Sequence, residues 1–144
     1  MKKYLLALLI FLLFSLTANA QTWQGIIIHN GFYCYYLGSE ENPDVFAARE
    51  INALGIEWVY VKIKSPIDLG NTSTAWAKID GIATACSYHN GWIYLQLLNP
   101  GYNYITVYQD ALMLTGGETV TLNLRNLNIS QMRVNDHKAF DLYW

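Results

Sequence analysis

Residues 84–98 read TACSYHNGWIYLQLL, which is two segments of alternating side chains joined by a His-Asn-Gly turn. Asn-Gly readily adopts the two positive φ angles of a type I′ turn, a tight connection between antiparallel strands. The same arrangement occurs over residues 26–36, around Asn30 and Gly31. Because alternation with a period of two continues along most of the chain, the sequence predicts a mainly β domain.

Further turns and strands are expected toward the C-terminus. Residues 99–102 read Asn-Pro-Gly-Tyr and predict a tight turn, and Gly116-Gly117 predicts another turn before a strand at 119–124. Residues 131–134 and 139–143 are each interpreted as a short strand.

One segment lacks the alternation and favours a helix. Asn42 suits an N-cap, Pro43 suits the first helical position, and Gly55 suits the position after a helix end. The apolar residues between them recur at helical spacing: Ala47, Ala48, Ile51 and Leu54. The sequence therefore predicts a helix over 43–54, followed by a strand over 56–64.

The first twenty residues resemble a secretory signal peptide. Two lysines precede an apolar segment over residues 4–16, and Ala-Asn-Ala at 18–20 provides a small-residue cleavage site. The apolar segment is short for a membrane span, and no later segment approaches the roughly 20 apolar residues that a spanning helix needs. We therefore expect cleavage after Ala20, with the protein secreted or located in the periplasm or cell envelope.

The remaining chain, residues 21–144, is expected to form a single β-rich domain with no membrane span. It would consist of a hairpin and helix over 21–55 and an antiparallel Ig-like β-sandwich over 56–144. Of the 144 residues, 53% are hydrophobic and only 14% are charged, which excludes a disordered chain. Removing two of the nine cations with residues 1–20 gives a net charge of 7 − 11 = −4, which argues against a nucleic-acid partner.

The predicted strands separate aliphatic from aromatic side chains. In the strand over 57–64, for example, Val59, Val61 and Ile63 would face one side and Trp58, Tyr60 and Lys62 the other. The aliphatic columns are expected to form the core. The aromatic column suits recognition of sugars or proteins unless residues 21–55 cover it. As a ligand-binding hypothesis it comprises Trp58, Tyr60, Trp76, Trp92, Tyr94, Tyr104 and Tyr108.

The stretch from about Val59 to Leu124 resembles the carboxypeptidase regulatory-like, or transthyretin-like, β-sandwich domain. The residues that carry the resemblance are the strand at 75–79, Asn90-Gly91 followed by the strand at 92–95, and Asn99-Pro100-Gly101-Tyr102 followed by the strand at 103–107. The resemblance implies an Ig-like fold in a non-catalytic module of a secreted or envelope protein.

The sequence offers little chemistry beyond this surface. Cys34 and Cys86 would form either a disulfide, as an oxidising compartment allows, or two buried thiols. His29 and His89 each precede an Asn-Gly turn without metal-ligand spacing, so no metal site is predicted. With no catalytic motif present, we expect no enzyme activity and no cofactor.

Three functional hypotheses follow. The first is a secreted, non-enzymatic β-sandwich module that acts by binding or assembly at the cell envelope or outside the cell. The second is a carbohydrate-binding protein that stacks a polysaccharide on the aromatic strand face. The third is a structural subunit that self-assembles or docks a protein partner.

Overall fold

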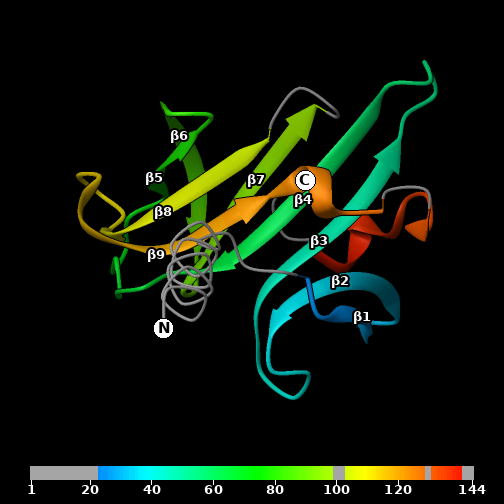
Figure 1. Cartoon of the computed structure of the whole chain (residues 1–144), viewed down its shortest axis with the longest axis horizontal. Coiled ribbons are helices and arrows are strands. Elements are labelled where there is room, and N and C mark those ends of the chain that lie inside the picture. The colour runs from blue at the N-terminus through cyan, green and yellow to red at the C-terminus, as the bar shows by residue number, and fades with distance from the viewer. Residues whose placement is uncertain (1–22, 99–102, 129–130, 141–144) are drawn as a thin grey trace, which may run out of the picture.

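The computed structural model describes residues 23–98, 103–128 and 131–140. In this part of the chain, antiparallel strands form one hydrogen-bonded sheet in the order β1-β2-β3-β4-β7-β6-β5-β8-β9, drawn in Figure 1. The strands are β1 (Gly25–His29), β2 (Phe32–Gly38), β3 (Pro43–Ile51), β4 (Glu57–Lys64), β5 (Thr74–Ile79), β6 (Ile82–His89), β7 (Trp92–Leu98), β8 (Tyr104–Asp110) and β9 (Thr115–Asn123). Among the described residues that follow, the short 3₁₀ helices are η1 (Leu124–Asn126) and η3 (Asp136–Phe140).

The predicted mainly β class is confirmed. The strands belong to one continuous sheet, so the division into two sheets that the word sandwich implies is not confirmed. The expected signal peptide and the predicted turn at 99–102 lie outside the described residues.

Two-residue turns connect three of the hairpins. The predicted turns are confirmed, because Asn30 and Gly31 have φ angles of 51° and 85° and Asn90 and Gly91 have 48° and 87°. A third turn of this kind, Asp80-Gly81, joins β5 to β6. The Asp80 carboxylate also accepts hydrogen bonds from the backbone N–H groups at positions 103 and 104, which anchors the start of β8 to this turn.

The helix predicted over 43–54 is wrong. Residues 43–51 form β3, which pairs with β2 on one side and β4 on the other. Both faces of β3 are covered: Val45 and Ala47 pack in one apolar cluster, and Phe46 and Ala48 pack in another. A strand that is buried on both faces does not alternate between apolar and polar residues. Its apolar residues therefore also fit the spacing of one face of a helix.

Three other local predictions are also wrong. Gly116 and Gly117 lie inside β9, at a register irregularity between the pairs Tyr108–Glu118 and Asp110–Thr115. The turn before them is made by residues 111–114. Residues 131–134 form no strand, although Val134 makes one isolated bridge to Arg49. Residues 136–140 form η3 in place of the predicted strand, whose last residues, 141–143, lie outside the described chain.

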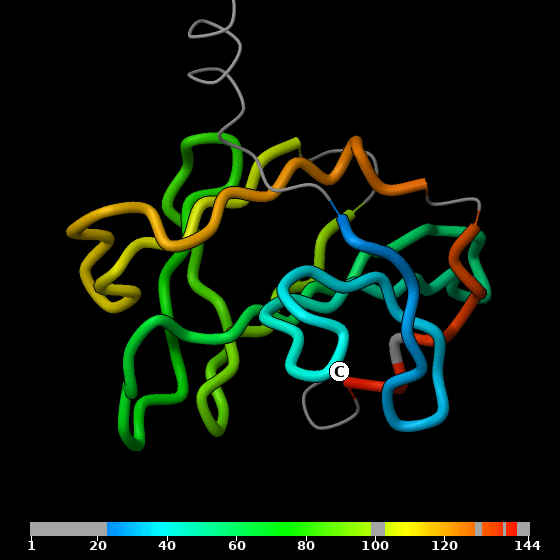
Figure 2. The backbone as a smooth tube through the Cα atoms, turned by 60° about the horizontal axis from the view of Figure 1, so that its bottom comes forward, coloured from blue at the N-terminus to red at the C-terminus, as the bar shows by residue number. Residues whose placement is uncertain are grey.

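The sheet curls so that β9 returns toward β3 and β4, as Figures 1 and 2 show. A cleft of about 210 Å³ marks this approach, with Val45 and Ile63 on one side and Thr119 and Val120 on the other. We call the concave side the inner face. The predicted aliphatic columns lie there, and they form the main core with Leu124, Leu127 and Met132 from the C-terminal segment.

Candidate functional site: the outer face of the sheet

The strand register places all seven predicted binding residues on the convex side, which we call the outer face. Residues paired directly across neighbouring strands share a face of a sheet. Tyr94 pairs with Lys62 on β4 and with Ser87 on β6. From Ser87 the same face continues along β6 to Ala85, which pairs with Trp76 on β5. It then reaches β8 through the pair of Lys78 with Thr106, so that Tyr104 and Tyr108 also lie on it.

The first part of the outer face, over β2, β3, β4 and β7, is covered. We call it the aromatic cluster; its buried members are Cys34, Phe46, Ala48, Tyr60, Tyr94, Ala139 and Phe140, with Ile27, Phe32, Trp58 and Trp92 half-buried around them. Four of the seven predicted binding residues therefore belong to a packed cluster. Tyr60 and Tyr94 are buried within it, and Trp58 and Trp92 use part of their surface for packing.

The cover is the C-terminal helix η3, and the sequence predicted cover only from residues 21–55. The backbone N–H of Tyr33 donates to Oδ2 of the buried Asp136 at 3.0 Å. The Asn30 side-chain amide donates to the Ala139 carbonyl oxygen, also at 3.0 Å. The Phe140 ring then lies 6.2 Å from the Phe46 ring, and His29 stacks on Phe46 at 4.3 Å. The first hairpin and η3 thus close the cluster together.

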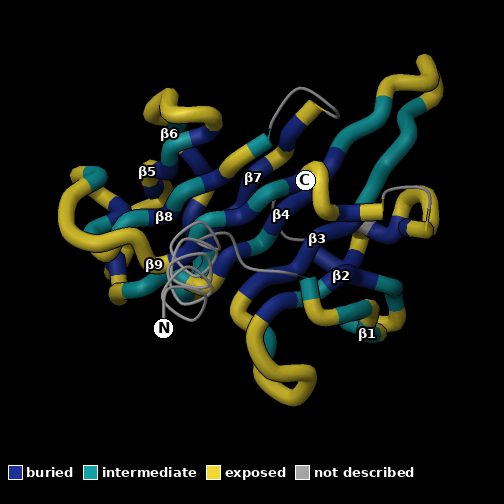
Figure 3. The backbone as a smooth tube through the Cα atoms, viewed as in Figure 1, coloured by how far each residue is buried: buried dark blue, intermediate teal, exposed yellow. Residues whose placement is uncertain are grey.

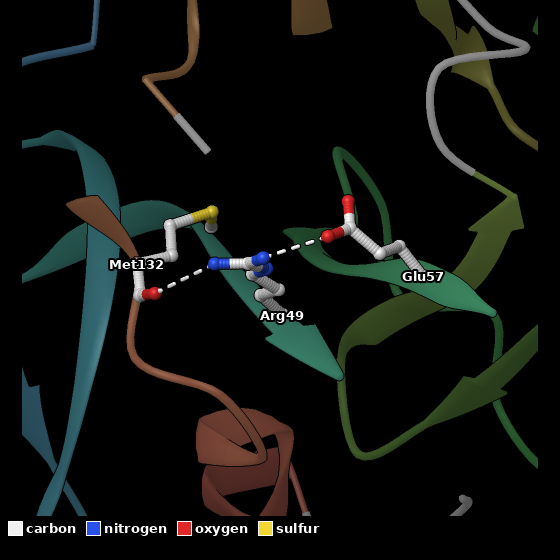
Figure 4. A network of polar contacts seen from close by, with 3 residues as sticks. All are labelled: Arg49, Glu57 and Met132. Carbon is white, nitrogen blue, oxygen red and sulfur yellow. Dashed lines mark hydrogen bonds and ion pairs between the residues drawn. The ribbon is translucent and has the colours of Figure 1, made fainter. Parts of the chain in front are cut away.

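Arg49 on β3 holds the segment before η3 against the sheet through a hydrogen bond. Its guanidinium donates to the Met132 carbonyl oxygen at 3.3 Å and to Glu57 Oε1 at 2.7 Å, as Figure 4 shows. The Arg133 guanidinium also lies 3.6 Å from the centre of the Tyr33 ring. These contacts join the C-terminal segment to β2, β3 and β4.

Two polar groups of the aromatic cluster, the Lys62 ammonium and the Tyr60 hydroxyl, have partners there. The Lys62 ammonium lies 4.6 Å from the centre of the Trp92 ring and within 6 Å of the centres of Phe46 and Tyr94, a cation–π arrangement. The Tyr60 hydroxyl donates to the Glu50 carboxylate. Burial, followed by this hydrogen bond, raises the pKa of Tyr60 above its ordinary value, so the hydroxyl remains a donor.

The second part of the outer face, over β5 and β8, is open. Figure 3 shows buried segments concentrated along β3, β4 and β7, with more exposed and intermediate ones toward β5, β8 and β9. The side chains of Trp76 and Tyr104 are 38% and 45% exposed. The Lys78 ammonium lies 5.3 Å from the centre of the half-buried Tyr108 ring. We call Trp76, Lys78, Tyr104 and Tyr108 the open platform.

Small and polar residues surround the open platform. Trp76 is paired with Ala85 on β6, so the side chain directly across from it on that strand is small. Thr106 pairs with Thr121 on β9, and the Asn123 side-chain amide donates to the Tyr104 hydroxyl at 3.4 Å. Hydroxyl and amide groups therefore lie beside flat rings. The sequence predicted the three aromatic members, and the contribution of Lys78 followed only from its contact with Tyr108.

Cys34 and Cys86 are both free and buried. Cys34 belongs to the aromatic cluster, whereas Cys86 packs in the inner core. Their strands, β2 and β6, are four positions apart in the sheet, or roughly 19 Å at the usual strand spacing. This separation exceeds the reach of a disulfide. Burial raises the pKa of each thiol to about 12.

Within the described ranges, no group of three or more His, Cys, Asp or Glu side chains gathers as a metal site would require. None of the helices found there is long and apolar enough to cross a membrane. Comparison with known proteins finds no match for this chain among protein-family models, curated proteins or solved structures.

Proposed function

We propose that this chain is a secreted, non-enzymatic β domain that binds a partner at the cell envelope or outside the cell, through the open platform. The observation that carries the proposal is the exposure of Trp76 and Tyr104 on a sheet face whose aromatic residues over β3, β4 and β7 belong to a packed cluster. Exposed aromatic side chains with polar neighbours are typical of recognition surfaces. The expected signal peptide and the resemblance to carboxypeptidase regulatory-like domains support secretion and a non-catalytic role.

A polysaccharide is the partner that the chemistry of the platform favours. Flat aromatic rings stack on the apolar faces of sugar rings, and neighbouring hydroxyl and amide groups bond to sugar hydroxyls. Trp76 offers such a ring beside the small Ala85, and Thr106, Thr121 and Asn123 supply the polar groups. Lys78 lies over Tyr108 and adds a cation at the same place.

Replacing Trp76 by alanine is expected to weaken polysaccharide binding at least tenfold, or by about 1.4 kcal/mol or more, because the ring would be a central contact. Co-sedimentation of the chain without residues 1–20 with cellulose, chitin and xylan measures the effect. The Tyr108→Ala variant is expected to weaken the same interaction. Both variants should keep the free energy of unfolding within about 1 kcal/mol, since Trp76 and Tyr108 lie outside both buried clusters.

Ile82→Ala is the matched control, because Ile82 is an exposed apolar residue of β6 outside the open platform. Its binding should equal that of the unchanged chain. If no polysaccharide of the panel binds, the glycan proposal is wrong. Polysaccharide cleavage by the purified chain, measured as released reducing ends, would contradict the non-enzymatic role.

A further inference from the structure

The strand β1 ends the sheet with an unusually apolar edge. Among the described residues it pairs only with β2, and residues 24–33 contain no Asp, Glu, Lys or Arg. Ile26 and Ile28 are 42% and 64% exposed. An exposed apolar edge strand presents unpaired backbone groups to other chains, and soluble proteins usually protect such edges with charge, proline or a bulge.

The opposite edge of the sheet carries those protections. The strand β9 has a register irregularity near Gly116 and Gly117, which disrupts a regular ladder. It also carries the exposed Glu118 at this point. The two edges therefore differ in kind, and only β1 presents a regular, uncharged strand.

The hairpin geometry determines which backbone groups of β1 are free to pair. His29 and Phe32 flank a two-residue turn and form its closing pair. In such a hairpin the closing pair exchanges both backbone hydrogen bonds, and these bonded pairs alternate along the strand. Ile27 therefore bonds to β2, whereas the N–H and C=O groups of Ile26 and Ile28 point away from it.

We propose that β1 pairs antiparallel with β1 of a second copy of this chain, about a two-fold axis at Ile27, so that two sheets become one. In this register Ile26 of each copy lies opposite Ile28 of the other, and each such pair exchanges two hydrogen bonds. Ile27 lies opposite Ile27 of the second copy, and the small Gly25 lies opposite His29.

The second copy is favoured over another partner because the edge is complementary to itself. A two-fold pairing places the strand against a copy of itself, so a charge in the middle of β1 would lie directly across from its own copy or diagonal to it and would be repelled. The strand has none, and isoleucine meets isoleucine at all three central positions. The open platform lies on β5 and β8, away from this edge in the sheet order, so the pairing leaves it accessible and does not depend on its function.

Sedimentation of the chain without residues 1–20, over a series of concentrations, tests the pairing. The unchanged chain is expected to reach twice its own mass. Ile26→Pro removes an outward N–H without removing a bond to β2, and Ile28→Lys places a charge on the edge, so both variants should remain at the mass of one chain. Ile82→Lys, at a residue that is 70% exposed on β6, is the matched control and should still form the dimer.

Cross-linking tests the register independently of any loss of folding. Because Cys34 lies directly across from position 27 on β2, the test is made in a Cys34→Ala background. There Ile27→Cys should form an intermolecular disulfide under mild oxidation, because non-hydrogen-bonded antiparallel pairs bring Cα atoms within disulfide range. Ile82→Cys in the same background should not, and the remaining native thiol, Cys86, is buried. A monomer at every concentration would overturn the proposal, as would a dimer that persists in both edge variants or cross-links equally at positions 27 and 82. If the edge variants lose the dimer but bind polysaccharide as the unchanged chain does, then the β1 edge and the open platform act independently.

Discussion

Replacing Phe140 by alanine is expected to lower the free energy of unfolding by about 3–5 kcal/mol, the usual cost of truncating a fully buried phenylalanine. Phe140 is 2% exposed and its ring contacts those of Phe46 and His29. The residue also holds η3 over the outer face, so its loss should expose Trp58 and Trp92 to water. Denaturant unfolding measures the first effect, and a red shift of tryptophan emission measures the second.

The control for this change is Val134→Ala, because Val134 is an exposed apolar residue of the same C-terminal segment. This substitution should change the free energy of unfolding by no more than about 0.5 kcal/mol, as is usual for surface substitutions. A loss of less than about 1 kcal/mol for Phe140→Ala would mean that η3 does not close the aromatic cluster.

The stability of the protein is expected to fall by about 5 kcal/mol between pH 7 and pH 11 through its two thiols. Burial raises the pKa of Cys34 and of Cys86 from 9.0 to about 12 in the folded chain. Between these values the thiols lose their protons in the unfolded chain and keep them in the folded chain. Their contribution to stability is therefore fully present below about pH 9 and is lost progressively as the pH rises above it. Two pH units at about 1.4 kcal/mol each, reduced slightly because a little of the folded thiol is already ionised at pH 11, give about 2.7 kcal/mol per thiol.

The variant Cys34→Ala/Cys86→Ala separates this contribution from the titration of lysines and tyrosines. Each protein is compared with its own stability at pH 7, measured by denaturant unfolding, so the cavities left by the substitutions do not enter the comparison. Above pH 9 the free energy of unfolding of the variant should decline less steeply than that of the unchanged chain. Equal pH profiles for the two proteins would contradict buried free thiols at these positions.

The features predicted correctly from the sequence are those set by neighbouring residues. Asn30-Gly31 and Asn90-Gly91 determine their turns through local backbone preference, and the period of two in β4 and β7 determines which side chains share a face. These signals do not depend on distant parts of the chain. The division of aliphatic and aromatic columns was therefore predictable before the strand order was known.

The features predicted wrongly depend on contacts between distant residues. The sequence predicts a helix where β3 forms, because it does not reveal that both faces of this segment are buried. The cover of the aromatic cluster depends on Asp136 meeting the Tyr33 backbone across 103 positions of sequence. A helix as short as η3 has no periodicity to detect. Which aromatic residues pack and which remain open thus required the strand register and the C-terminal contacts.

The indole N–H signals of the tryptophans, followed by nuclear magnetic resonance during titration with cello-, chito- and xylo-oligosaccharides, test the proposed binding surface most directly. One of these oligosaccharides is expected to shift the signal of Trp76 and to leave those of Trp58 and Trp92 in place, because η3 and the first hairpin pack against the cluster that holds them. A shift of Trp58 and Trp92 without Trp76, or no shift with any of the three, would contradict binding at the open platform.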